Sequence, residues 1–212
     1  MYLYIFFFAA FVLYFTNKRR VLNKQVDLFN KLLYMEKSPE RYIEEIDRLL
    51  LKFQSEKERN INLIQKTTGL FYAGKFEEVI KILKNDVNKI PSNWQVIYYH
   101  NLIISLFLSG EIQEGKELFA ESKETIDVYY GKDYNKVTVE LICAVADFYN
   151  GNASKTKEFF SNLTKTGKND YRIAIGYYFL SKIFDLENKI DESEENLEKA
   201  KIYGQGSFIE RL

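Results

Sequence analysis

Four times along this chain of 212 residues, two amphipathic segments of helical length are joined at a glycine or an asparagine. The turn centres are Gly74, Gly110, Gly151 and Asn188, which gives intervals of 36, 41 and 37 residues. Glycine and asparagine suit this place because the residue after a helix C-terminus often adopts the left-handed conformation that they tolerate. One such hairpin cannot bury its apolar face alone. A period in this range therefore predicts a stack of antiparallel helical hairpins rather than a globular bundle.

The rest of the chain also reads as helix. After Thr16 no segment alternates apolar and polar residues as a strand would, and prolines occur only at positions 39 and 91. Ser38-Pro39-Glu40 is typical of a helix start, with serine as the N-cap and proline at the first helical position. Apolar stripes lie on both sides of it, over residues 21–33 and 42–53. They predict one further, degenerate hairpin ahead of the four.

Within the repeats, large and small apolar residues recur at matching places, and the segment FYAGKFEEVIKIL is the clearest example. The first repeat carries Leu63, Leu70, Gly74, Phe76, Val79, Leu83 and Pro91. The second carries Tyr99, Leu106, Gly110, Ile112, Gly115 and Phe119. The third and fourth carry Ala144, Phe148, Gly151 and Phe160, and then Tyr177, Phe184, Ile190, Ser193, Leu197 and Ala200. This pattern resembles the tetratricopeptide-repeat (TPR) family, whose unit is about 34 residues long.

The resemblance implies an all-α fold, a right-handed superhelical stack of antiparallel hairpins. We expect four TPR-like repeats within residues 59–203, at about 59–92, 94–127, 136–167 and 171–203. The degenerate hairpin would occupy residues 18–58, and residues 204–212 would form a C-terminal tail.

The N-terminus presents a different pattern, because every residue from Tyr2 to Phe15 is apolar or aromatic. A helix over this run would span roughly 22–27 Å, against a hydrocarbon core of about 30 Å. We expect residues 1–17 to be a transmembrane anchor, with residues 2–16 in the bilayer and the headgroups contacted by Lys18, Arg19, Arg20 and Lys24. These trailing charges predict a single-pass protein of the cell membrane, its N-terminus outside and its repeats cytoplasmic. A cleaved signal peptide and a buried core helix are the alternatives.

By family register, the first helices of the repeats would line a concave groove, and this groove would be the partner-binding site. The groove-lining residues implied by the resemblance are Ile64, Phe71, Tyr72, Ile97, His100, Ile104, Phe107, Leu141, Phe148, Tyr149, Tyr178 and Lys182. Most are apolar or aromatic, which favours a partner segment that is itself apolar, extended or helical. The alternative is that the array packs these side chains against itself or covers them with residues 204–212.

Catalytic and cofactor chemistry is poorly represented. His100 is the only histidine and Cys143 the only cysteine, so no histidine metal cluster or catalytic triad is apparent. No phosphate-binding glycine loop is present, and we expect no metal and no cofactor. The formal net charge is zero, which argues against a nucleic-acid partner.

The sequence therefore predicts a non-catalytic, membrane-tethered scaffold that binds a protein or peptide in the groove. A constitutive subunit of a larger membrane complex and a secreted or surface-exposed binding protein are the alternatives.

Overall fold

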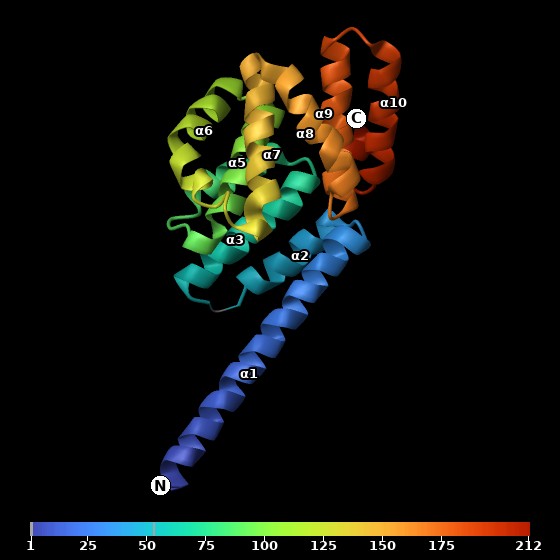
Figure 1. Ribbon diagram of the computed structural model, residues 1–212. Helices are drawn as coiled ribbons and strands as arrows, with labels where there is room; N and C mark the ends of the chain where they lie inside the picture. The colour runs from blue at the N-terminus through green and yellow to red at the C-terminus, as the bar shows by residue number, and fades with distance from the viewer. Residues whose placement is uncertain (1, 53) are drawn as a thin grey trace.

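The computed structural model describes residues 2–52 and 54–212, apart from the side chains of residues 2–10, 13, 14, 18 and 134. Within these residues every regular element is a helix, so the all-α prediction is confirmed (Figure 1). The elements are α1 (Tyr2–Asn30), η1 (Lys31–Met35), α2 (Pro39–Leu50), α3 (Glu56–Tyr72), α4 (Phe76–Asn85), η2 (Ser92–Trp94), α5 (Gln95–Ser109), α6 (Ile112–Asp127), α7 (Asp133–Asp147), η3 (Phe148–Asn152), α8 (Ala153–Thr166), α9 (Asp170–Leu186), α10 (Ile190–Tyr203) and η4 (Phe208–Arg211).

The expected turn geometry is present at all four turn centres. Gly74, Gly110 and Gly151 have φ of 76°, 93° and 84°, and Asn188 has φ of 57°. Each of these residues reverses the chain between two helices, which gives the hairpins α3–α4, α5–α6, α7–α8 and α9–α10. Consecutive hairpins pack through α4 on α5, α5 on α7, and α8 on α9.

Local sequence signals explain where the helices begin. Ser55 and Glu58 form a capping box at the start of α3: the Ser55 hydroxyl accepts from the Glu58 N–H at 3.3 Å, and the Glu58 carboxylate accepts from the Ser55 N–H at 3.0 Å. Pro91, which lacks an N–H, lies in extended conformation between α4 and η2. These signals fix the helix boundaries independently of the packing.

The long helix α1 projects away from the body of the molecule (Figure 1). Among the described residues, no helix combines the length and the apolar character needed to cross a membrane. The predicted transmembrane anchor and the single-pass membrane localisation are therefore wrong. The reason is length: the apolar run at residues 2–15 spans only roughly 22–27 Å as a helix before charged residues begin. A bilayer core is about 30 Å thick.

The predicted lipid contacts lose their support with the anchor. Arg19, Arg20 and Lys24 are exposed, the Lys18 side chain lies outside the described set, and nothing in the fold orients them toward a bilayer. The interaction of residues 2–16 with lipid is likewise unsupported.

The last hairpin returns to the first. Lys37, between η1 and α2, forms an ion pair with Asp170 at the start of α9, with Nζ and Oδ2 2.7 Å apart. Beside it, Tyr171 stacks on Tyr72 of α3 at a centroid distance of 4.5 Å, and Tyr34 meets the edge of the same pair. The beginning and end of the array thus lie side by side, so the array closes on itself.

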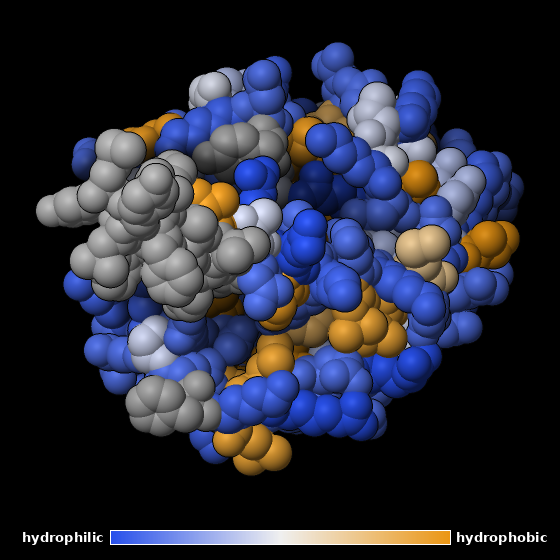
Figure 2. Space-filling view, turned by 90° about the horizontal axis from the view of Figure 1, so that it is seen from below, coloured by the Kyte–Doolittle hydropathy of each residue, from blue (hydrophilic) through white to orange (hydrophobic). Residues whose placement is uncertain are grey.

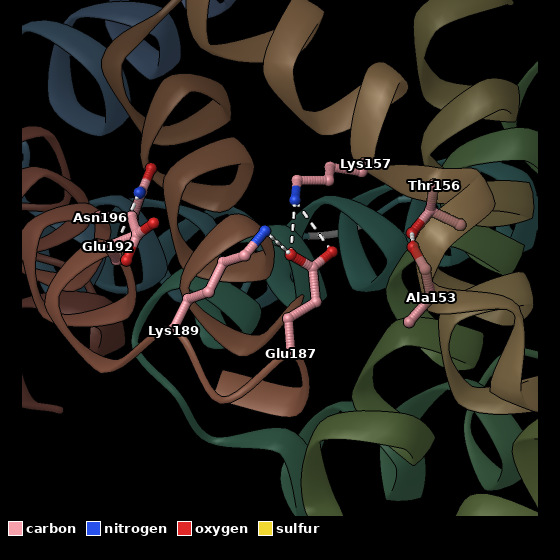
Figure 3. A network of polar contacts seen from close by, with 7 residues as sticks. All are labelled: Ala153, Thr156, Lys157, Glu187, Lys189, Glu192 and Asn196. Atoms are coloured by element: carbon pink, nitrogen blue, oxygen red, sulfur yellow. Dashed lines mark hydrogen bonds and ion pairs between the residues drawn. The ribbon is translucent and has the colours of Figure 1, made fainter. Parts of the chain in front are cut away.

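A polar network at the surface orients the last hairpin against α8 (Figure 3). Lys157 of α8 and Lys189 each donate to the carboxylate of Glu187, both at 2.8 Å, and these hydrogen bonds lower the pKa of Glu187. The Lys157 ammonium also lies 4.1 Å from the centroid of the Phe184 ring. Exposed ion pairs contribute little stability, so this network adds little to the packing of α9 on α8.

Candidate binding face

The residues predicted to line the groove lie mostly inside the protein. Seven of them are buried: Ile64, Phe71, Tyr72, Ile104, Phe107, Leu141 and Tyr178. Five are half-buried: Ile97, His100, Phe148, Tyr149 and Lys182. Whether they bind a partner stays a prediction, but the structure does place other parts of the chain against them.

One group of these side chains forms an aromatic stack between the second, third and fourth hairpins. Phe107 of α5 stacks on Tyr149 with the rings nearly parallel, at 3° and a centroid distance of 4.7 Å. Phe148 and Phe160 both contact Phe179 of α9, at 5.4 and 4.7 Å. Because each ring is packed against rings from other helices, this group acts as core that joins the hairpins.

A second group forms a surface that the chain itself covers. It consists of Phe71 and Tyr178 together with Phe76, which was not predicted to line the groove, and we call these three side chains the aromatic face. Phe208 of η4 lies against all three rings, at centroid distances of 6.0, 5.1 and 6.2 Å. The side chain of Phe208 is 8% exposed and that of its neighbour Ile209 is 1% exposed. Residues 204–212, which we call the strap, therefore cover the aromatic face.

Polar contacts hold the strap in place. The Arg211 guanidinium donates to the carbonyl of Ala73, with Nη2 and O 2.7 Å apart. Ala73 is the C-terminal cap of α3, where the helix presents unpaired carbonyls and partial negative charge. Within the strap, Gly206 N–H donates to the Glu210 carboxylate and the Ser207 hydroxyl donates to the Gly204 carbonyl, at 2.7 and 2.6 Å. The strap is thus a compact turn rather than a continuation of α10.

Two ionisable side chains at the aromatic face, His100 and Tyr178, have shifted pKa values. Burial lowers the pKa of His100 to about 4, and Arg172 lowers it further, while the hydrogen bond with Asn101 acts in the opposite direction. Burial also raises the pKa of the Tyr178 hydroxyl to about 12. At neutral pH both side chains are therefore neutral, so this part of the molecule suits an apolar segment.

Two charged side chains lie at the border of this region. Lys182 sits 4.9 Å from the centroid of the Tyr178 ring, and burial lowers the pKa of this lysine, opposed by Asp185. Arg172 donates to the Thr138 hydroxyl at 2.7 Å. Each cation is thus held by a partner inside the chain.

A buried polar link, which the sequence did not suggest, joins α3 to α5. Asn101 is 1% exposed, and its side-chain N–H groups donate to the hydroxyls of Thr67 and Thr68 at 3.1 and 3.0 Å. Its carbonyl oxygen lies 2.9 Å from Nδ1 of His100, which places the proton of neutral His100 on Nδ1. An asparagine in the middle of a largely apolar helix was the available signal.

Phe208, Ile209 and Arg211 are the other residues that sequence reasoning did not select. Residues 204–212 are predicted as a possible cover of the groove, but the sequence does not single out these three side chains. The signal was the pair of large apolar side chains in a short segment otherwise rich in glycine and polar residues.

The site offers no evident catalytic chemistry. Within the part of the chain that is described, no three His, Cys, Asp or Glu side chains are grouped to hold a metal ion. Burial raises the pKa of the Cys143 thiol, so this cysteine is protonated at neutral pH and is a poor nucleophile.

A hollow lies between α1 and the body. It has a volume of about 740 Å³ and is lined on the α1 side by Val21, Leu22 and Val26. These three side chains are about half exposed, and Phe11, Val12 and Phe15 extend the exposed apolar residues along α1. Seen from below, the surface is mostly hydrophilic, with apolar patches among the hydrophilic residues (Figure 2).

Comparison with known proteins identifies the fold. No protein-family model matches the chain, and no curated protein matches it. Two crystal structures do: both are of nearly identical TPR-like repeats of a candidate kinesin light chain from Podosopora anserina, one of them with a single substitution. Each is 15% identical, with a TM-score of 0.50, over 86% of this chain and 93% or 94% of the other. At this identity the likeness concerns fold alone, and the chain has a TPR-like helical repeat fold.

Proposed function

We propose that this chain is a non-catalytic protein-interaction scaffold whose aromatic face binds an apolar segment of a partner protein. TPR-like repeats present rigid helical surfaces to other proteins, and the predicted repeats at residues 59–203 would supply that surface here. The single observation that carries the proposal is the strap itself. The aromatic face already holds a short apolar segment, with ring contacts from Phe208 and a backbone contact from Arg211.

The chemistry of the face determines what it can bind. Phe71, Phe76 and Tyr178 supply flat apolar walls, and the neutral His100 beside Phe71 adds no charge. The C-terminal cap of α3 supplies a carbonyl acceptor at the edge. A segment with large apolar side chains and one cationic donor meets both requirements.

The test is capture of partner proteins from a lysate of the source cells by the full chain, quantified for wild type and variants. Phe76→Ala removes a half-buried wall of the face, and it should reduce the captured partner about tenfold or more. Phe159→Ala on α8 is the matched control, because it removes an equally half-buried ring away from the strap. Equal capture by the wild type and by both folded variants would show that no partner uses this face.

One observation favours a second function, that of a constitutive subunit of a larger complex. The exposed apolar residues of α1 and the adjoining hollow give this helix a surface suited to permanent burial in an assembly. In that case Val21→Ser with Leu22→Ser would release a stoichiometric, salt-resistant partner, and Phe76→Ala would not. If Phe76→Ala releases the partner and the α1 substitutions do not, the result supports the scaffold proposal and contradicts the constitutive subunit.

A further inference from the structure

The strap packs so tightly against the body that no partner segment fits between them. A Cβ on Gly74 would lie 2.7 Å from Cβ of Phe208, and a Cβ on Gly206 would lie 1.9 Å from the Lys37 carbonyl oxygen. The strap is therefore in contact with the α3–α4 turn on one side and with the η1–α2 connection on the other. Any partner segment that reaches Phe71 and Phe76 along this route must first displace it.

The strap uses three distinct recognition elements over four residues. Phe208 enters between the rings of the aromatic face, Ile209 is the most deeply buried apolar residue of the strap, and Arg211 donates to the Ala73 carbonyl. The charged donor at a helix C-terminus gives direction, because a segment lying the other way round would place its cation away from that carbonyl. The aromatic and aliphatic pair supplies the apolar contact.

This inference rests on the proposed function above. We propose that the strap is a displaceable self-ligand: it closes the partner site, and its side chains resemble those of the partner segment. The partner segment is a peptide with an aromatic–aliphatic pair followed, two residues after the aliphatic residue, by an arginine. The strap competes with this peptide for the aromatic face. A strap that is open in fewer than about one molecule in ten lowers the apparent affinity for the partner by about tenfold or more.

The local structure of the strap suits such a role. Its internal hydrogen bond from the Gly206 N–H to the Glu210 carboxylate can persist when the strap leaves the face. Gly204 and Gly206 flank the point where the strap departs from α10, and Gly206 has a φ of 76°. Release therefore requires rotation at a short glycine-containing connection and no unfolding of α10.

The experiment measures binding of a fluorescein-labelled peptide with the sequence of residues 204–212 to the full chain, by fluorescence anisotropy. Phe208→Ser withdraws the strap from the aromatic face while leaving the face intact, so this variant should bind the peptide at least about tenfold more tightly than wild type. A peptide carrying Phe208→Ala or Arg211→Ala should bind the same variant about tenfold more weakly than the unchanged peptide. Circular dichroism verifies that each variant is folded.

Gly206→Ala provides a second variant, because its new Cβ meets the Lys37 carbonyl and loosens the strap without altering the face. Gly151→Ala is its matched control: it also places alanine at a positive φ, 84°, but with nothing within 4 Å of the added Cβ. Tighter peptide binding by Gly206→Ala and unchanged binding by Gly151→Ala is the expected pattern. Folded strap variants that bind the peptide no better than wild type would overturn the proposal.

The two proposals can fail separately. A partner captured through Phe76 in equal amounts by wild type and by Gly206→Ala would refute the strap as a competitor and leave the scaffold function intact. Absence of any capture through Phe76, by wild type or by the loosened strap variants, would refute the scaffold function itself.

Discussion

Acidification should destabilise this protein through His100. Burial holds the pKa of this imidazole at about 4, against 6.5 for an unperturbed histidine. Between these two values the unfolded chain binds a proton that the folded chain does not, so the free energy of unfolding falls as the pH is lowered. Each pH unit within that window is worth about 1.4 kcal/mol. Going from pH 7 to pH 5, which crosses about 1.5 units of it, should remove about 2 kcal/mol.

Urea denaturation followed by circular dichroism at pH 7, 6 and 5 measures this effect. The His100→Gln variant is the comparison, because its amide can still donate to Asn101 but does not titrate. Carboxylates titrate alike in both proteins, so the difference between the two pH profiles isolates the histidine. Parallel profiles would refute the assignment of a neutral His100 beside the aromatic face.

Three substitutions test the packing around the site. Phe107→Ala removes a ring that is 2% exposed and stacked on Tyr149, and it should lower the free energy of unfolding by about 3–5 kcal/mol in urea denaturation; a loss below about 1 kcal/mol would place this ring outside the core. Asn101→Ala should lower it by about 1–3 kcal/mol, since buried threonine hydroxyls lose their donor, and an unchanged midpoint would count against that link. Gly69→Ala puts a Cβ 2.7 Å from the Tyr42 ring and should lower the free energy of unfolding by about 1–3 kcal/mol, which a lower melting temperature would report. An unchanged melting temperature would show that α2 and α3 can separate without loss.

The helical hairpins could be read from the sequence because their signals are local. Gly74 and Asn188 indicate left-handed turns, and Ser55 with Glu58 indicates a helix start. Each signal lies within a few residues of the structure that it specifies. Such signals depend on backbone conformation and on hydrogen bonds inside one segment.

The N-terminal segment shows where local reasoning misled. The hydropathy of the run from Tyr2 to Phe15 and the charges that follow it predict a membrane anchor. Hydropathy indicates that residues avoid water, but spanning a bilayer also demands length, and the described α1 lacks a long enough apolar stretch. Flanking charges such as Arg19 and Arg20 cannot supply that length.

The chain by itself determined an all-helical repeat with apolar first helices, because period and side-chain type fix both. It also marked Phe71, Phe107 and Tyr178 as candidates to line a partner-binding groove. Only the tertiary structure decided what covers each of them: the ring of Tyr149 for Phe107, and the strap for the aromatic face. Such contacts join residues far apart in sequence, as Arg211 and Ala73 are, and depend on how the rotation from hairpin to hairpin accumulates along the array. No single repeat encodes this accumulated rotation. Only the folded chain therefore shows that the strap covers the aromatic face.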